Sequence, residues 1–235
     1  MAENYSPDAS ALICGSVAYD TILVFPDRFK THILPDKLHT LNISFLVPEM
    51  RREFGGCAAN IAYGLNLLGD RGIAMATVGH DFAPYKDRML SLGIPVEHIK
   101  ILDDTFTAQA FITTDLDDNQ ITAFPPGAMQ FAHRNKVADA GPGVALGIVA
   151  PDGRQAMIEH AAQFEAASIP FVFDPGQGLP MFGGDELKTF LRQARWVAVN
   201  DYEWGMLQQK TGLSADEVAS QVEALIGKPL AGQPL

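Results

Sequence analysis

The sequence predicts an α/β fold with a central, mostly parallel sheet flanked by helices and a small β lid. From residue 145 onward, apolar runs of about five residues alternate with segments of helical periodicity. Short strands separated by helices are typical of a parallel sheet with helices on both faces. Residues 21–50 differ, because apolar and polar residues mix there around three prolines. This mixture predicts exposed strands and loops that form a lid.

Length and composition are those of one globular domain. The 235 residues are 47% hydrophobic and 19% charged, a composition that allows a buried core and excludes a disordered chain. The net charge of −11 argues against a nucleic-acid-binding surface. The longest apolar runs, such as residues 144–150, are too short to cross a bilayer, and the first ten residues lack a secretory signal. We therefore predict a single cytoplasmic domain over residues 1–235, with neither a membrane nor a nucleic-acid partner.

The first half of the chain predicts two helices, two strands and a hairpin. In order, these are a strand at residues 11–17, a helix at 57–68, a strand at 73–78, a helix at 81–92, and a hairpin of residues 107–114 and 120–124. Gly55 and Gly56 precede the first helix, and Gly69 is a suitable terminator for it. The polar residues 117–119 supply the turn of the hairpin.

The second half predicts the regular alternation of a parallel sheet. The predicted strands are residues 145–149, 170–173 and 196–199, and the predicted helices are residues 153–167, 184–194, 202–210 and 215–226. After residue 226 the sequence becomes rich in proline and glycine, which predicts a turn or tail and ends the alternation.

Four polar features fall where parallel α/β sheets bind ligands, outside the carboxyl ends of strands. They are Asp20 after the first strand, Gly55-Gly56 with Asn60 at the first helix, Asp174 after a later strand, and Asn200 with Glu203 after the last one. Each feature also has a structural interpretation. The two aspartates suit turns, the glycines permit a positive φ, and the last pair suits a helix cap.

The order of these features resembles the ribokinase-like (PfkB-type) carbohydrate and nucleoside kinases. The matching segments are GSVAYD, REFGGCAANIAYGLNLLG, ATVGHD, FDPG and VNDYE, spread from about residue 12 to residue 226. The segment GGCAANIAYGLNLLG is the most specific, because it is close to the N-terminal signature of that family. The resemblance implies a ribokinase-like α/β fold with a small β lid.

The resemblance also implies roles for particular residues. Asp20, Gly55, Gly56 and Asn60 would bind the hydroxyl groups of a ribose-like substrate. The pair Asn200 and Glu203 would organise Mg²⁺ and phosphate, with Glu203 meeting the metal through water. The implied cofactors are therefore ATP and Mg²⁺. Residues 21–50 and 107–128 would form the lid that closes over the sugar, and a homodimer could form through this lid.

Within the family, the segment DNQITAFPPGAM and the long first lid segment look most like bacterial adenosine and nucleoside kinases. This implies phosphorylation of an adenosine-like nucleoside at its 5′-hydroxyl. Gln109, Phe111 and Phe124 fall where lid residues could meet a base, although each also suits an ordinary strand. The alternatives are a sugar kinase, similar to ribokinase or fructokinase, and a non-catalytic nucleoside-binding module. A dehydrogenase is disfavoured, because no GxGxxG follows the first strand.

The second signature of the family does not occur in the chain. That signature is a Gly-Ala-Gly-Asp-like sequence at a helix N-terminus, which supplies the anion hole and the Asp base. The resemblance therefore assigns no catalytic base to any residue present. We expect a truncated domain without the C-terminal strands of the fold, which is inactive as it stands.

Overall fold

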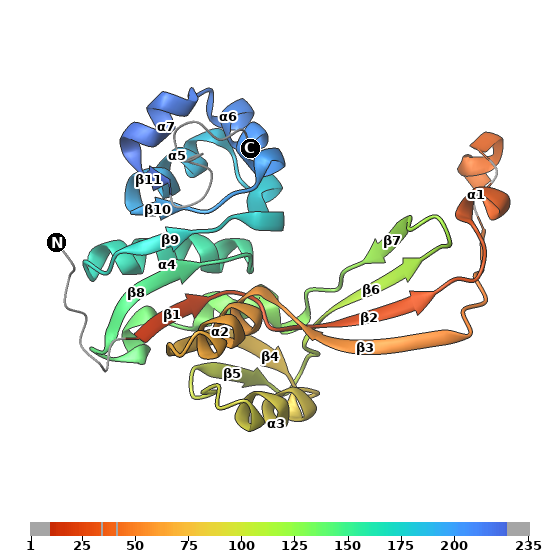
Figure 1. The fold of residues 1–235 in the computed structure, drawn as a ribbon, viewed down its shortest axis with the longest axis horizontal. Helices are drawn as coiled ribbons and strands as arrows, with labels where there is room; N and C mark the ends of the chain where they lie inside the picture. The colour runs from red at the N-terminus through yellow and green to blue at the C-terminus, as the bar shows by residue number, and fades with distance from the viewer. Residues whose placement is uncertain (1–9, 34, 41, 225–235) are drawn as a thin grey trace.

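The computed structural model of the protein describes residues 10–33, 35–40 and 42–224. Its main element is a parallel sheet with the strand order β11-β10-β9-β8-β1-β4-β5 (Figure 1). Its strands are β1 (Ser10–Cys14), β4 (Gly72–Gly79), β5 (Ile99–Leu102), β8 (Val144–Val149), β9 (Phe171–Phe173), β10 (Trp196–Val197) and β11 (Glu223–Ala224). The strands β4 and β5 lie on one side of β1, and the later strands β8 to β11 lie on its other side. The direction of winding thus changes between β1 and β8, where such sheets bind ligands.

Helices cover both faces of the main sheet. They are α2 (Cys57–Leu67), α3 (Ala83–Ser91), α4 (Arg154–Ala166), α5 (Gly184–Gln193), α6 (Asp201–Thr211) and α7 (Ala215–Gln221). Successive residues of β1 enter different cores, because side chains of a strand alternate between faces. Ile13 packs with residues of α2 and α3, and its neighbours Leu12 and Cys14 pack with residues of α4 and α5.

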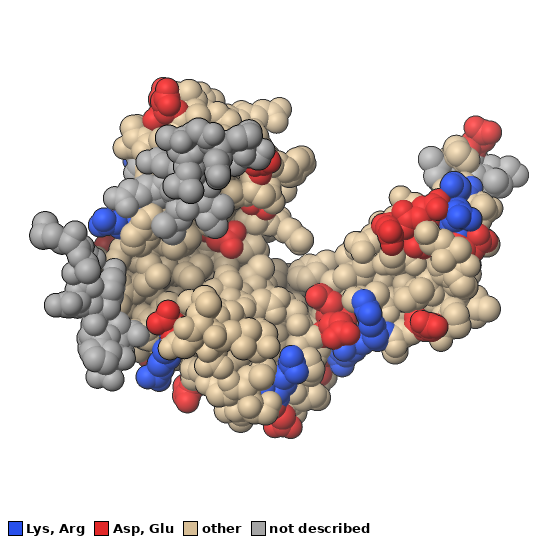
Figure 2. Space-filling view, in the orientation of Figure 1, with Lys and Arg blue, Asp and Glu red and all other residues tan. Residues whose placement is uncertain are grey.

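A second sheet projects from this body (Figure 1). It has the order β3-β2-β6-β7, with strands β2 (Ala18–Val24), β3 (Glu49–Gly55), β6 (Ala108–Thr114) and β7 (Gln120–Ala123). The pair β2–β6 is parallel, whereas β2–β3 and β6–β7 are antiparallel. We call this four-stranded sheet the lid. A hollow lies between the lid and the lobe that carries α5 to α7 (Figure 2). The predicted fold class is thereby confirmed.

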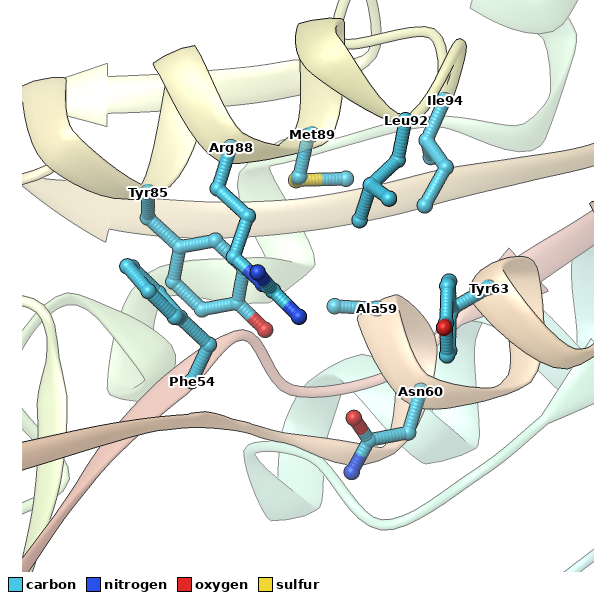
Figure 3. A pocket seen from close by; sticks show the side chains of 9 residues that line it. All are labelled: Phe54, Ala59, Asn60, Tyr63, Tyr85, Arg88, Met89, Leu92 and Ile94. Carbon is cyan, nitrogen blue, oxygen red and sulfur yellow. The ribbon is translucent and has the colours of Figure 1, made fainter.

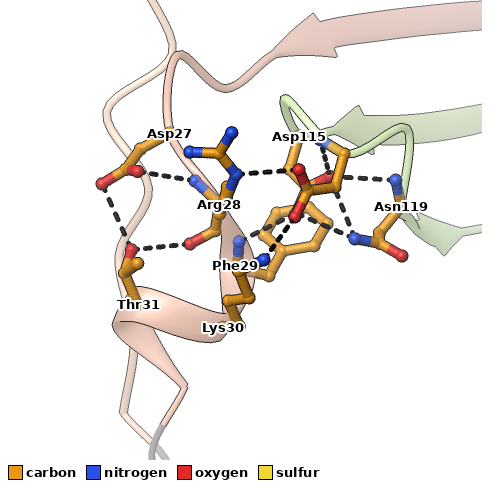
Figure 4. A network of polar contacts seen from close by, with 8 residues as sticks. Asp27, Arg28, Phe29, Lys30, Thr31, Asp115 and Asn119 are labelled. Carbon is orange, nitrogen blue, oxygen red and sulfur yellow. Dashed lines mark hydrogen bonds and ion pairs between the residues drawn. The ribbon is translucent and has the colours of Figure 1, made fainter.

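A polar network holds the tip of the lid together (Figure 4). The buried Asp115, in the turn after β6, accepts hydrogen bonds from the backbone N–H groups of Phe29, Asp117 and Asn119, each at 2.9 Å. Asp117 in turn forms ion pairs with Arg28 at 2.7 Å and Lys30 at 2.8 Å. These contacts fasten the short helix α1 (Phe29–His32) to the hairpin of β6 and β7.

The structure corrects several predicted boundaries. The last helix was predicted to reach residue 226, but α7 ends at Gln221 and β11 follows it. The strand β10 has only two residues, and β2 begins before residue 21. The strand β5 and four 3₁₀ segments were not predicted: η1 (Pro35–Thr40), η2 (Gly127–Arg134), η3 (Val137–Ala140) and η4 (Gly176–Met181). Residues 34 and 41 of the predicted lid segment 21–50, and the predicted tail after residue 226, lie outside the described residues.

No helix in the described ranges is both long enough and apolar enough to cross a membrane.

Gly56 lies just before α2 and Gly64 lies inside it, and only one of these two positions requires glycine. Gly56 precedes the helix with a φ of +95°, and a Cβ there would lie 2.6 Å from the carbonyl oxygen of Ser16 and 2.7 Å from the backbone nitrogen of Ala18. Gly64, inside α2, has no atom within 4 Å of its Cβ position. Both the backbone conformation and the available space therefore require glycine at position 56, and neither requires it at position 64.

We expect Gly56→Ala to lower the free energy of unfolding by about 3 kcal/mol or more, because strain and overlap act together. The matched variant Gly64→Ala should raise it by about 0.5–1 kcal/mol, since alanine favours a helix. Thermal unfolding followed by circular dichroism measures both changes. Equal melting temperatures for the two variants would contradict this assignment.

Candidate functional site

Asp20 lies on β2, with its carboxyl group against the start of α2. Its register partner across the antiparallel pair is Glu53 on β3. A side chain at position 55 would overlap the carboxyl group of Asp20, so Gly55 lets this group approach the backbone. Partial burial raises the pKa of Asp20, and the charge of Glu53 raises it further. The structure thus brings Asp20, Gly55 and Gly56 together at one corner.

Hydrogen bonds hold this corner from two directions. The N–H groups of Cys57 and Ala58, the first residues of α2, donate to the side-chain oxygen of Ser16 at 3.1 Å and to its carbonyl at 2.9 Å. The hydroxyl group of Tyr85 on α3 donates to the carbonyl of Gly55 at 2.7 Å. The corner is therefore fixed before any ligand binds, which lowers the ordering cost of binding.

Asn60 flanks the same corner from within α2. Its side chain is exposed and lines a cavity of about 120 Å³, together with Phe54, Tyr85 and Arg88 (Figure 3). Asp20 does not line this cavity. Figure 3 shows the amide of Asn60 directed away from Met89 and the other apolar side chains. Its predicted contact with a sugar is not tested by this geometry.

Gln109 and Phe111 are not brought together with Asp20. In the parallel pair of β2 and β6, Asp20 is paired with Ala110, whereas Thr21 is paired with Phe111. Neighbouring residues of a strand face opposite sides of a sheet. The side-chain amide of Gln109 accordingly donates to the Thr21 hydroxyl at 2.6 Å. Both predicted base contacts therefore lie on the face of the lid opposite Asp20.

Phe124 remains a candidate for a base contact. It directly follows β7, in which Ala123 is the register partner of Phe111. Continuing this register sets Phe124 opposite Ala110, on the same face as Asp20. Its side chain is 46% exposed, so the ring is available to a ligand.

Asn200 and Glu203 form a helix cap at the start of α6. The side-chain oxygen of Asn200 accepts from the N–H of Glu203 at 2.9 Å, and Glu203 accepts from the N–H of Asn200 at 3.0 Å. The structural interpretation of this pair is therefore confirmed. Glu203 also acts on Asp174, at the end of β9: burial, and then the charge of Glu203, raise the pKa of Asp174 to about 6.

This pair of carboxyl groups suits a hard cation, because oxygen ligands are what Mg²⁺ prefers. A bound cation would also relieve the repulsion that Glu203 exerts on Asp174. Within the described ranges, no group of three or more His, Cys, Asp or Glu side chains could by itself hold a metal ion. Any metal here would therefore take further ligands from water or from a bound phosphate.

Asp152 is a polar residue of this region that the sequence prediction missed. It follows β8, is only 2% exposed, and burial raises its pKa to about 8. A signal was available, because the turn residues Pro-Asp-Gly at 151–153 follow a predicted strand. Its depth in the fold, however, could not be deduced from that pattern.

The raised pKa of Asp152 makes stability depend on pH. The folded state keeps this proton up to about pH 8, whereas the unfolded chain releases it near the usual value of 3.8. Its effect is therefore a loss of stability as pH rises from about 4 to 8. We expect Asp152→Asn to be more stable than the parent at pH 7, by up to about 4 kcal/mol, and equal to it near pH 4.

Melting temperatures measured across this pH range provide the test, with Asp139→Asn as an exposed control. A difference between Asp152→Asn and the parent that stays constant with pH would contradict the assignment.

Comparison with known proteins places these features in a family. The profile of the pfkB family carbohydrate kinases matches residues 17–230. A Burkholderia thailandensis nucleoside kinase solved in complex with inosine is 53% identical, with a TM-score of 0.79 over 90% of this chain and 67% of that chain. The same enzyme in an ADP-inosine complex is 55% identical, with a TM-score of 0.76 over 90% of this chain and 66% of that one.

Two curated relatives are archaeal nucleoside kinases. The one from Methanocaldococcus jannaschii is 27% identical over 81% of this chain, and the one from Methanothermobacter thermautotrophicus is 32% identical over 78%. The match spans only 63% and 57% of the lengths of these two proteins. Because the family profile covers most of the sequence, the chain belongs to the pfkB family of carbohydrate kinases.

Proposed function

We propose that the protein is a nucleoside kinase, of the kind that transfers the terminal phosphoryl group of ATP to the 5′-hydroxyl of an adenosine-like nucleoside, although no residue of this sequence matches the catalytic base of the family. The observation that carries this proposal is the corner at which the carboxyl group of Asp20 lies against Gly55 and Gly56. It is supported by family membership and by the similarity to a nucleoside kinase solved with inosine and with ADP-inosine. We also place the protein in the cytoplasm, where ATP is available.

The corner has the chemistry that a pentose requires. A carboxylate accepts hydrogen bonds from two hydroxyl groups, and hydrogen bonds to a charged acceptor are stronger than those between neutral groups. The missing side chain at Gly55 leaves room for the carboxyl group of Asp20 against the backbone. Asn60, next to this corner, would add an amide contact. On the lid, Phe124 would stack on the base.

The phosphate end of the reaction would lie at Asp174, Asn200 and Glu203. Mg²⁺ would be held here through carboxylate oxygens and water, and when bound it would neutralise charge on the transferred phosphate. Asn200 and Glu203 hold each other in a defined geometry through the capping bonds, so neither has to be ordered when the ligands bind. Sequestration from water by the lid would prevent hydrolysis of ATP.

Binding to the purified chain tests the sugar site without requiring turnover. We expect Asp20→Ala to weaken adenosine binding about 10- to 100-fold in calorimetry, because charge-assisted hydrogen bonds are lost. The control is Asp70→Ala, which removes an exposed carboxyl group after α2 and should bind as the parent does. Ribose is titrated in parallel, because stronger binding of ribose than of adenosine would favour a sugar kinase. Unchanged affinity in Asp20→Ala would contradict the proposed site.

We further propose that two copies associate through the lid face opposite Asp20. Met50, Phe111 and Ile121 share this face and are 69%, 39% and 45% exposed. Several large apolar side chains gathered on one open sheet face are unusual for a surface that contacts only water. A second copy of the same sheet offers a surface of matching character.

Analytical ultracentrifugation of Phe111→Asp tests this association. A buried, unpaired charge should shift a dimer to a monomer at the same protein concentration. Leu90→Asp, on α3, places the same charge on an exposed apolar position away from the lid. A monomeric parent, or a dimer that survives Phe111→Asp, would contradict association through this face.

A further inference from the structure

Asp152 is a buried acid whose hydrogen bonding is incomplete. Its Oδ1 atom accepts from the N–H of Gly153 at 2.8 Å, whereas Oδ2 is buried without a hydrogen-bond partner among the described residues. No positively charged side chain is among the groups that act on its pKa. Buried polar atoms are almost always paired in folded proteins. The unpaired oxygen therefore points to a partner that is not part of the described protein.

Helix capping does not account for this residue. Asp152 lies just before α4, but the N-cap of that helix is Gly153 and it has no side-chain capping bond. The one hydrogen bond of Asp152 goes to the amide of its own neighbour. The free N–H groups of the first turn of α4 thus gain nothing from this carboxyl group, and its burial serves no visible structural purpose.

The position of Asp152 in the sheet is where a ligand is expected. It follows β8, next to β1, at the point where the winding of the sheet changes direction. The loops after these two strands are in contact, since the N–H of Ser16 donates to the carbonyl of Pro151 at 3.0 Å. Asp152 also raises the pKa of Cys14, after the larger effect of burial. The carboxyl group is therefore near the end of β1.

The start of α2, where the sugar site is proposed, lies beside the same loop, because Ser16 contacts both. Its N–H donates to the carbonyl of Pro151 at 3.0 Å, and its side-chain oxygen accepts from the N–H of Cys57 at 3.1 Å. Burial raises the pKa of the Cys57 thiol, and three carboxyl groups raise it further, those of Asp174, Asp152 and Asp20. Cys57 immediately follows the Gly55-Gly56 corner. Asp152 and Asp20 thus approach the first residue of α2 from two different strands.

We propose that Asp152 is a further substrate-binding residue, whose carboxyl group, when ionised, accepts at Oδ2 a hydrogen bond from a hydroxyl group of the pentose. This rests on the proposed function, and it adds a second carboxyl group to the sugar site. A neutral hydroxyl suits the position, because it donates a hydrogen bond without bringing a charge into the crevice. Away from water, such a hydrogen bond has no competing solvent contact.

The test compares Asp152→Asn with the parent chain in calorimetric titrations with adenosine and with inosine. The titrations are made at pH 9, where the carboxyl group, with its pKa raised to about 8 by burial, is ionised. Asparagine then has the same shape but presents a donor where the carboxyl oxygen accepts. We expect about tenfold weaker binding or more, with no loss of melting temperature at pH 8. Glu165→Gln, at the far end of α4, makes the same change in charge at an exposed position and should bind as the parent does. A role confined to folding would lower the melting temperature and leave affinity unchanged.

Each outcome decides a separate point. If the parent binds neither nucleoside, the proposed function fails. If the parent binds and Asp152→Asn binds equally well, only the role of Asp152 is overturned. Should Asp152→Asn not fold, as judged by circular dichroism, Asp152→Ser replaces it in the same titration. Failure of both variants to fold would show that the residue serves the fold, and would also overturn the proposal.

Discussion

The close approach of Gly56 to the backbone of Ser16 and Ala18 is the constraint on which the rest of the structure depends. At this crossing the main sheet passes into the lid, because β1 ends at Cys14 and β2 begins at Ala18. The returning strand β3 must turn into α2 within the same space. Only a residue without a side chain permits the turn, and the carboxyl group of Asp20 occupies the space left open beside Gly55. The crossing between the two sheets is therefore also the proposed sugar site.

The raised pKa values of the carboxyl groups in this region follow from the same packing of strands and helix. Three aspartates, at positions 20, 152 and 174, have pKa values raised by burial, and the two with quoted values reach about 8 and about 6. A fold gains no stability from acids held in this way. They are consistent with a ligand that donates hydrogen bonds at one end and brings a cation at the other. A nucleoside bound together with Mg-ATP has both properties.

Much of this arrangement could be predicted from the sequence. The glycine pair, the helix at α2 and the hairpin of β6 and β7 each carry a local signal. Which lid side chains share a face with Asp20 could not be predicted, because a shift of one residue in strand register moves a side chain to the other face. Gln109 and Phe111 were expected to meet a base, and the register sets them on the face of the lid opposite Asp20. Asp152 was missed for another reason: its burial is set by packing from distant segments.

A crystal structure of the chain with adenosine bound tests the central claim most directly. The account predicts that the ribose lies over the Gly55-Gly56 corner, with its hydroxyl groups within hydrogen-bond distance of Asp20. Adenosine bound in the cavity lined by Phe54 and Arg88, with the corner left to solvent, would contradict it.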